Sequence, residues 1–217
     1  MIRRRTLLIA AAGSLVAART ASATAVFEDI TFRVVRKGDD IGRHAIRFEP
    51  QGSSVKVTTA IDIKVKMAFI TVASFKQDAV ETWQDGHLVE GKSRIADDGD
   101  VSDVSFAADG SQLVVQGPKG RLKVPVGTMT DISFWNQDIV RQPAVIDTQT
   151  TDLIRMKADG GPKKEMVNLG NGRSVEGIRY ELTSPQGRSG FIWYDAKGRF
   201  IRTSFKTRGE QLDYYPI

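Results

Sequence analysis

The sequence predicts a mostly β protein: a single strongly curved antiparallel sheet or half-barrel, formed by a meander of about thirteen strands with at most one or two short helices. The strongest observation is the alternation in residues 55–69, where every second position is apolar except Thr59. This period of two is typical of a strand with one dry and one wet face. Turn signals recur about every ten residues, and helical periodicity is nearly absent.

The first 25 residues have the composition of an export signal peptide. Arg3, Arg4 and Arg5 precede a mildly apolar run over residues 7–18, and small residues follow. That run is too short to span a bilayer and no later segment is long enough, so we expect no membrane span. Arg4 and Arg5 also fit a twin-arginine signal, which leaves the Sec and twin-arginine routes both open. We therefore expect an exported, periplasmic protein with a single β domain over residues 26–217.

Charge and cysteine content exclude several classes of function. The chain carries a net charge of +5, but residues 1–25 hold four arginines and no acidic residue, so the remainder is nearly neutral. A nearly neutral exported chain gives no reason to expect nucleic-acid binding. The absence of cysteine excludes disulfides, thiolate zinc sites and iron–sulfur clusters. A hydrophobic core must therefore hold the domain together.

The first strands follow the signal directly. Residues 27–36 and 41–48 are expected to form a hairpin across Lys37-Gly38-Asp39-Asp40, a turn rich in residues that tolerate positive φ. The strand over residues 55–69 comes next. At about 3.3 Å per residue it would extend roughly 50 Å, so the sheet must coil or bend. Its alternation shifts after Ala68, which predicts a β-bulge there or a segment covered on both faces.

The middle of the chain predicts a ladder of hairpins. Glycine turns end at Gly86, Gly99, Gly110 and Gly120, and three of them are Asp-Gly, a strong hairpin signal. The strands expected between them cover residues 79–83, 88–95, 101–106, 113–115 and 122–126.

The alternation fails between residues 128 and 163. Residues 133–136 are expected to end a strand, and either 137–141 or 145–156 to form a short helix. A connection of this length is more often functional or a covering element than a plain loop. Beyond it, the sequence predicts strands over residues 164–168, 173–183, 188–194, 199–207 and 210–215.

The chain contains five short motifs: Gly38-Asp39-Asp40-Ile41-Gly42-Arg43-His44, Glu81-Thr82-Trp83-Gln84-Asp85-Gly86-His87-Leu88, Phe134-Trp135-Asn136, Ile146-Asp147-Thr148-Gln149 and Trp193-Tyr194-Asp195. Together they resemble a family of small exported bacterial proteins that is known only as a domain of unknown function. The resemblance covers nearly the whole chain after the signal, and it implies an exported, mostly β protein without implying an activity. A looser similarity of expected architecture links the chain to periplasmic lipoprotein carriers, whose curved sheet wraps a helix and an apolar cavity for acyl chains.

Candidate ligand-binding residues are few. Alternation places His44 on the expected core face beside Ile46 and Phe48, where a hydrogen-bonded core histidine is the simpler interpretation. Three tryptophans lie where strands meet turns, positions that either plug a barrel end or line its mouth. The candidate ligand-binding residues are His44, Trp83, Trp135, Trp193 and Tyr194.

Charged residues suggest two further sites. Four carboxylates would support acid–base catalysis if the fold brought them together: Glu81, Asp85, Asp147 and Asp195. A basic stretch near the C-terminus is either the solvated face of a strand or a contact for an anionic surface, through Arg199, Arg202, Lys206 and Arg208. The sequence has no hydrolase elbow, phosphate loop or zinc motif. No catalytic residue, metal site or cofactor is therefore assigned.

The leading function hypothesis is an exported, non-enzymatic binding protein whose curved sheet holds a lipid-like or amphipathic ligand in an apolar pocket. The alternatives are a periplasmic hydrolase that uses His44 and clustered carboxylates, and a structural or partner-binding module with a filled core. The oligomeric state stays open. The apolar face of residues 55–69 decides between scaffold and ligand site, according to whether it faces side chains or a void.

Overall fold

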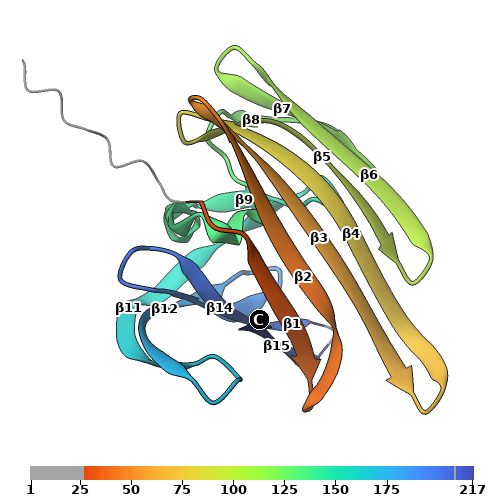
Figure 1. Cartoon of the computed structure of the whole chain (residues 1–217). Helices are drawn as coiled ribbons and strands as arrows, with labels where there is room; N and C mark the ends of the chain where they lie inside the picture. Colours follow the sequence, from red (N-terminus) through yellow and green to blue (C-terminus); the bar gives the residue numbers. More distant parts are fainter. Residues whose placement is uncertain (1–26, 208) are drawn as a thin grey trace, which may run out of the picture.

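One antiparallel sheet of thirteen strands dominates the computed structural model, which describes residues 27–207 and 209–217 (Figure 1). Its strands form two meanders in which each strand pairs with the next one along the chain. The first meander contains β1 (Ile30–Arg36), β2 (Asp39–Gln51), β3 (Ser54–Met67), β4 (Ile70–Gln84), β5 (His87–Asp97), β6 (Asp100–Asp109), β7 (Gln112–Gly117) and β8 (Gly120–Pro125). The second contains β11 (Lys157–Asn168), β12 (Ser174–Thr183), β13 (Ser189–Tyr194), β14 (Phe200–Thr207) and β15 (Glu210–Pro216).

The two meanders join where β1 pairs with β15, so the first and last strands lie side by side inside the sheet. The sheet ends at β8 and β11, which do not pair with each other, so the barrel is open. Because strand twist accumulates over so many strands, the sheet curls into a trough (Figure 1). These features confirm the predicted fold class.

Residues 126–156, here called the crossing segment, connect β8 to β11 and lie on the inner side of the trough (Figure 1). Its buried side chains belong to the same apolar core as buried residues of both meanders. Its elements are two 3-10 helices, η1 (Ser133–Trp135) and η2 (Gln137–Arg141), and a two-stranded ribbon of β9 (Ala144–Ile146) and β10 (Leu153–Arg155).

Within the crossing segment two sequence expectations are wrong and one is confirmed. Residues 133–136 end no strand, because Ser133–Trp135 is a 3-10 turn. Residues 145–156 form no helix, because Ala144–Ile146 pairs with Leu153–Arg155. The short helix over Gln137–Arg141 is present, with the Asn136 side chain accepting a hydrogen bond from the Asp138 amide at 3.0 Å.

The long strand also ends earlier than expected. β3 stops at Met67, and Ala68 and Phe69 form the turn to β4, where Ala68 has a φ of 52°. Apolar residues that follow the turn therefore belong to β4. The bulge falls before Ala68, where the β3–β4 register shifts between Val65 and Lys66.

Two residues of the first motif have clear backbone roles. Gly38 closes the β1–β2 turn with a φ of 93°, a conformation that glycine adopts without strain. A Cβ on Gly42 would lie 2.0 Å from the carbonyl oxygen of Asp62, so only glycine fits where β2 approaches β3.

The export signal predicted for residues 1–25 lies outside the described residues, as does Arg208. No helix within the described part of the chain is long and apolar enough to cross a membrane.

Candidate functional site

A cavity of about 630 Å³ lies inside the trough, between the sheet and the crossing segment. Both meanders and the crossing segment contribute to its wall. Most of the side chains that line its interior are apolar, including Ile41, Ile61, Ile63, Ile95, Ile132, Ile154, Leu182, Phe200, Leu212 and Tyr214. Exposed residues border its mouth, among them Val72, Arg188 and Lys206. This volume is in the range of small-molecule sites.

The apolar face of β3 has two different environments. Near the start of the strand, Val55 and Val57 are buried in the apolar core. Further along the same face, Ile61 and Ile63 also belong to this core and, with Val65, border the cavity. The dry face that the sequence predicts is therefore packed along much of its length, and its second half also borders the cavity.

His44 of β2 is a polar group in this largely apolar wall. It lies opposite Ile61 in the β2–β3 register, and its ring lies 5.9 Å from that of Phe32 and 5.8 Å from that of Tyr214. Its Nε2 is buried and has no hydrogen-bond partner among residues 27–207 and 209–217. Burial lowers the pKa of His44 to about 4, so the imidazole is neutral at physiological pH.

Other polar groups in the wall already bond to protein. Gln77 of β4 is buried, and its amide nitrogen donates to Ser93 Oγ at 3.0 Å and to Thr148 Oγ1 at 2.9 Å. Thr203 Oγ1 donates to the carbonyl oxygen of Phe191 at 2.9 Å. His44 therefore differs from Gln77 and Thr203 in having a buried ring nitrogen without a hydrogen-bond partner in the described chain.

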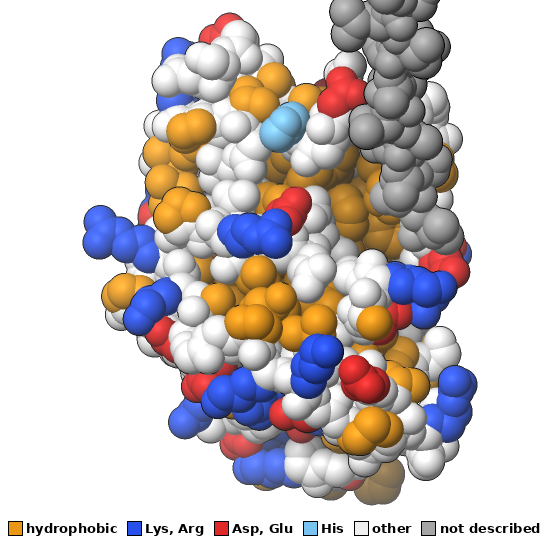
Figure 2. Space-filling view, turned by 90° about the vertical axis from the view of Figure 1, so that its left-hand side faces the viewer, with side chains coloured by type: hydrophobic (Ala, Val, Ile, Leu, Met, Phe, Trp, Pro, Cys, Tyr) orange, Lys and Arg blue, Asp and Glu red, His pale blue; other side chains and the backbone are white. Residues whose placement is uncertain are grey.

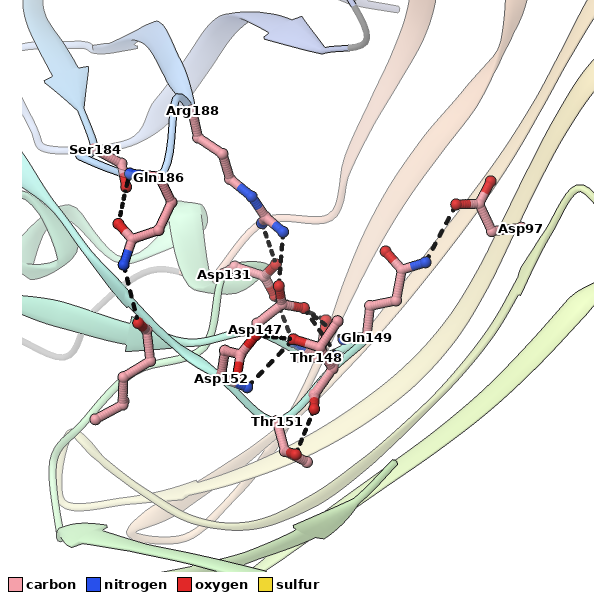
Figure 3. A network of polar contacts seen from close by, with 12 residues as sticks. Asp97, Asp131, Asp147, Thr148, Gln149, Thr151, Asp152, Ser184, Gln186 and Arg188 are labelled. Atoms are coloured by element: carbon pink, nitrogen blue, oxygen red, sulfur yellow. Dashed lines mark hydrogen bonds and ion pairs between the residues drawn. The ribbon is translucent and has the colours of Figure 1, made fainter. Parts of the chain in front are cut away.

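A network of charged residues lies at the mouth (Figure 3). The Arg188 guanidinium contacts Asp131 Oδ2 at 3.2 Å and Asp147 Oδ2 at 2.6 Å. Burial and the nearby Asp147 carboxylate raise the pKa of Asp131, while the Thr148 hydrogen bond and Arg188 oppose this shift. Gln149 extends the network by donating to Asp97 at 3.2 Å. The network joins the crossing segment to β5 and to the β12–β13 turn.

A second buried network lies around Glu81 of β4. Its carboxylate accepts hydrogen bonds from Thr130 Oγ1 at 2.5 Å, from Trp83 Nε1 at 3.2 Å and from Ser133 Oγ at 3.3 Å. Burial raises the pKa of Glu81 to about 7, and these hydrogen bonds oppose the rise. Trp135 packs edge-on against Trp83 with ring centroids 5.0 Å apart. Both tryptophans border a separate hollow of about 780 Å³.

The structure does not gather the predicted ligand-binding residues at one site. His44 lines the 630 Å³ cavity, whereas Trp83 and Trp135 line the other hollow. Trp193 and Tyr194 line neither hollow. Successive strand residues point to opposite faces, so these two side chains lie in different clusters. Tyr194 is buried in the main core and donates to the carbonyl oxygen of Phe134 at 2.8 Å, and Trp193 packs in a second cluster with Val167 and Leu169.

The predicted acidic cluster does not form. Glu81 belongs to the buried network described above, and Asp85 lies exposed in the β4–β5 turn. Asp147 contacts Arg188 at the cavity mouth, while Asp195 bonds to Arg199 in the β13–β14 turn at 2.7 Å. The carboxylate that does lie beside Asp147 is Asp131, which the sequence analysis missed.

The basic stretch is also divided. Arg199 pairs with Asp195 and Glu28, and Arg202 pairs with Asp213 while lying over the Trp193 ring. Lys206 borders the cavity mouth. Among residues 27–207 and 209–217 there is no group of three or more side chains suited to hold a metal ion.

Figure 2 shows apolar side chains reaching the surface between scattered charged groups on one face of the molecule. The curved open sheet, its crossing segment and the internal cavity define a β-barrel-like protein. The chain belongs to the family described as "Domain of unknown function (DUF6134)", whose model matches residues 32–217. The predicted membership in a family of unknown function is thereby confirmed.

One solved structure with a similar fold is a beta-barrel-like protein of domain of unknown function DUF1849 from Brucella abortus. It aligns with a TM-score of 0.59 and 9% identity, covering 87% of this chain and 94% of that chain. At this identity the likeness shows the fold alone. No curated protein matches the chain.

Proposed function

We propose that this protein is an exported, periplasmic and non-enzymatic binding protein that holds one lipid-like or amphipathic molecule in the 630 Å³ cavity. The observation that carries the proposal is the position of Ile61, Ile63 and Val65. Their apolar side chains border the cavity, and Ile61 and Ile63 also belong to the apolar core. Native cores are close-packed, so an apolar cavity of this size in a small domain favours a ligand site over a structural module with a filled core.

The cavity wall suggests how the ligand lies. Its apolar part would contact the aliphatic and aromatic interior, where burial contributes about 0.8 kcal/mol per methylene group. Its polar end would lie at the mouth, near Arg188 and Lys206. Since Arg188 already pairs with two carboxylates, the ligand needs no negative charge to be accommodated there.

Catalysis has weaker support. No hydrogen bond joins His44 to a carboxylate within the described chain, and the four predicted carboxylates lie in different places. A hydrolase would need an activated nucleophile or a positioned acid–base pair at the bound molecule. We therefore favour binding over the hydrolase alternative.

The test is binding of a fluorescent fatty acid to the purified chain, with native mass spectrometry for molecules retained on purification. Ile63→Trp would fill the cavity from its wall, and we expect it to weaken probe binding at least about tenfold. Asp62→Trp is the matched control, because the neighbouring residue is exposed on the opposite face of β3 and should leave binding unchanged. Equal binding by both variants, or no binding by the unaltered chain, would contradict the proposal.

Export is tested separately by cell fractionation of the full chain. Deletion of residues 2–25 should retain the protein in the cytoplasm. Replacing Arg4 and Arg5 by lysine tests the route, because it should block twin-arginine transport and leave Sec transport intact. A periplasmic protein that persists without residues 2–25 would contradict the export proposal.

A further inference from the structure

The β3–β4 hairpin extends beyond its neighbours in the sheet. Pairing of β2 with β3 ends at Ile63, and pairing of β5 with β4 ends at Phe75. Residues 64–74, here called the hairpin tip, therefore have ladder partners only in each other. Four residues of β3 lie beyond the last β2 partner and reach about 13 Å further. The tip lies at the lower end of the molecule in Figure 1, in yellow-orange.

The hairpin tip exposes large apolar side chains. Met67 is 67% exposed, Phe69 101%, Ile70 70% and Val72 48%. Only four other large hydrophobic residues in the described chain are exposed: Val101, Leu153, Met166 and Ile217. A concentration of exposed apolar surface of this kind marks a contact site.

Turn geometry does not account for Phe69. The tight turns at Lys37-Gly38, Asp85-Gly86 and Asp98-Gly99 each place glycine after a residue with positive φ. In the hairpin tip the positive φ falls on Ala68, at 52°, and Phe69 is not among the residues with positive φ. The backbone of this turn therefore calls for neither glycine nor a large side chain at position 69. The exposed ring is not needed to form the turn.

The charge of the hairpin tip indicates what kind of apolar partner the tip contacts. Lys64 and Lys66 lie on β3, and residues 64–74 contain no acidic residue. Two carboxylates contact the base of the tip: Asp62 lies 3.6 Å from Lys64 Nζ in a solvent-exposed pair, and Asp98 accepts a hydrogen bond from the Ser74 amide at 2.6 Å. Long lysine side chains reach phosphate head groups while neighbouring apolar side chains lie deeper in a bilayer. Each lysine near an anionic membrane surface adds to the attraction. An apolar tip with two flanking cations matches the surface of an anionic bilayer.

The hairpin tip is continuous with the cavity. Val65, Val72 and Ala73 belong to the tip and also border the cavity mouth. The apolar face of β3 thus runs from the cavity interior at Ile61 to the exposed Met67. A bilayer in contact with the tip would lie next to the opening.

We propose that the hairpin tip inserts into the surface of a lipid bilayer that carries anionic head groups, and so positions the cavity mouth at the membrane. This contact goes beyond the proposed function, since it holds whether or not the cavity retains a ligand. Phe69 and Ile70 supply the apolar insertion, and Lys64 and Lys66 supply the preference for anionic lipid.

The first experiment measures co-sedimentation of the purified chain, without residues 1–25, with vesicles of phosphatidylcholine alone or mixed with phosphatidylglycerol. We expect binding to the mixed vesicles that a Phe69→Ser/Ile70→Ser variant weakens at least about tenfold. The matched control is Met166→Ser/Ile217→Ser, which removes two side chains that are each 67% exposed elsewhere and should leave binding unchanged. Lys64→Gln/Lys66→Gln should lower the ratio of binding to mixed vesicles over binding to phosphatidylcholine vesicles roughly tenfold.

A second experiment locates the contact. Because the chain has no cysteine, Phe69→Cys allows a single environment-sensitive fluorophore to be attached at the tip, and Ser111→Cys places one in the β6–β7 turn as a control. Vesicles should shift the emission of the label at position 69 to shorter wavelength and leave that at position 111 unchanged.

The proposal is overturned if the unaltered chain binds neither kind of vesicle. It is also overturned if the Phe69→Ser/Ile70→Ser variant binds the mixed vesicles as tightly as the unaltered chain. Self-association that depends on the tip, without vesicle binding, would assign the tip to a second copy of the chain and also overturn it. The fluorescent fatty acid provides the separate readout: tip variants should retain its binding, so failure of the membrane contact and failure of the ligand site are distinguishable.

Discussion

Thr130 Oγ1 of the crossing segment donates a 2.5 Å hydrogen bond to Glu81 Oε1 in the middle of β4. Both side chains are buried, with 0% and 1% of their surface exposed. This contact ties the crossing segment to the sheet through a carboxyl group whose pKa is raised to about 7 by burial. Stability should therefore depend on whether Glu81 carries a proton.

The first prediction concerns the pH dependence of Glu81. Between about pH 4.5 and 7 the folded protein keeps a proton on Glu81 that the unfolded chain has released, so Glu81 contributes a decrease in the free energy of unfolding as pH rises. Glu81→Gln should remove this contribution, about 1.4 kcal/mol per pH unit. Urea unfolding at several pH values measures it. A variant whose pH profile parallels that of the unaltered protein would refute the assignment.

His44 should show the opposite sign. Between about pH 4 and 6.5 the unfolded chain binds a proton on this histidine that the folded protein does not bind, so the free energy of unfolding rises with pH. Between pH 4.5 and 6.5 the two effects should nearly cancel. His44→Gln should then expose the downward slope from Glu81, and Glu81→Gln the upward slope from His44. Slopes of the same sign in the two variants would rule out this pairing of effects.

Asp147 should be structurally important, because its side chain is 4% exposed and contacts Arg188 at 2.6 Å. It also accepts from the amides of Gln149 at 2.8 Å and Thr150 at 3.1 Å. Asp147→Ala should lower the free energy of unfolding by about 3 kcal/mol, since it removes the ion pair and the hydrogen bonds that this buried carboxylate accepts. Asp152→Ala is the control: its ion pair with Lys119 is solvent-exposed, and its loss should have little effect in the same denaturant series.

Gly42→Ala should be costly, because its Cβ would meet the Asp62 backbone. We expect a loss of about 3 kcal/mol, the upper range for forced overpacking. Gly38→Ala has open space around it and should cost only the strain of its positive φ, about 1 kcal/mol. Thermal and urea unfolding of the two variants should reproduce this order, and the reverse order would show that β2 and β3 separate easily.

Two positions on the apolar face of β3 should respond differently to truncation. Val57→Ala removes two methyl groups from a fully buried site and should cost about 2 kcal/mol. Val65→Ala acts at the cavity wall, where the lost contacts are fewer, and should cost less than about 1 kcal/mol. Equal losses of unfolding free energy in Val57→Ala and Val65→Ala would mean that the cavity is filled in solution.

Local patterns were enough to predict the sheet. Alternation and glycine turns are short-range features, and a meander pairs each strand with its neighbour in sequence. The crossing segment was harder, because two 3-10 helices and two three-residue strands are too short to show periodicity, and its burial comes from packing against distant strands.

The site was predicted only where alternation applied. His44 was placed on the inner face by its position in the strand. Arg188 was missed as a member of the cavity mouth, because its partners Asp131 and Asp147 lie 57 and 41 residues away in sequence. Trp193 and Tyr194 were grouped as neighbours in sequence, although successive residues of a strand point to opposite faces.

The pairing of β1 with β15 has a consequence for the order of folding. Within each meander every ladder contact is local, so both halves of the sheet have short loops to close. The seam between the first and last strands spans most of the chain and cannot close until the C-terminal strand is available. Local contacts form quickly and distant ones slowly, so closure of this seam is the expected late step in folding. Until then, one edge of β1 is unpaired, and such an edge can pair with strands of other chains and cause aggregation.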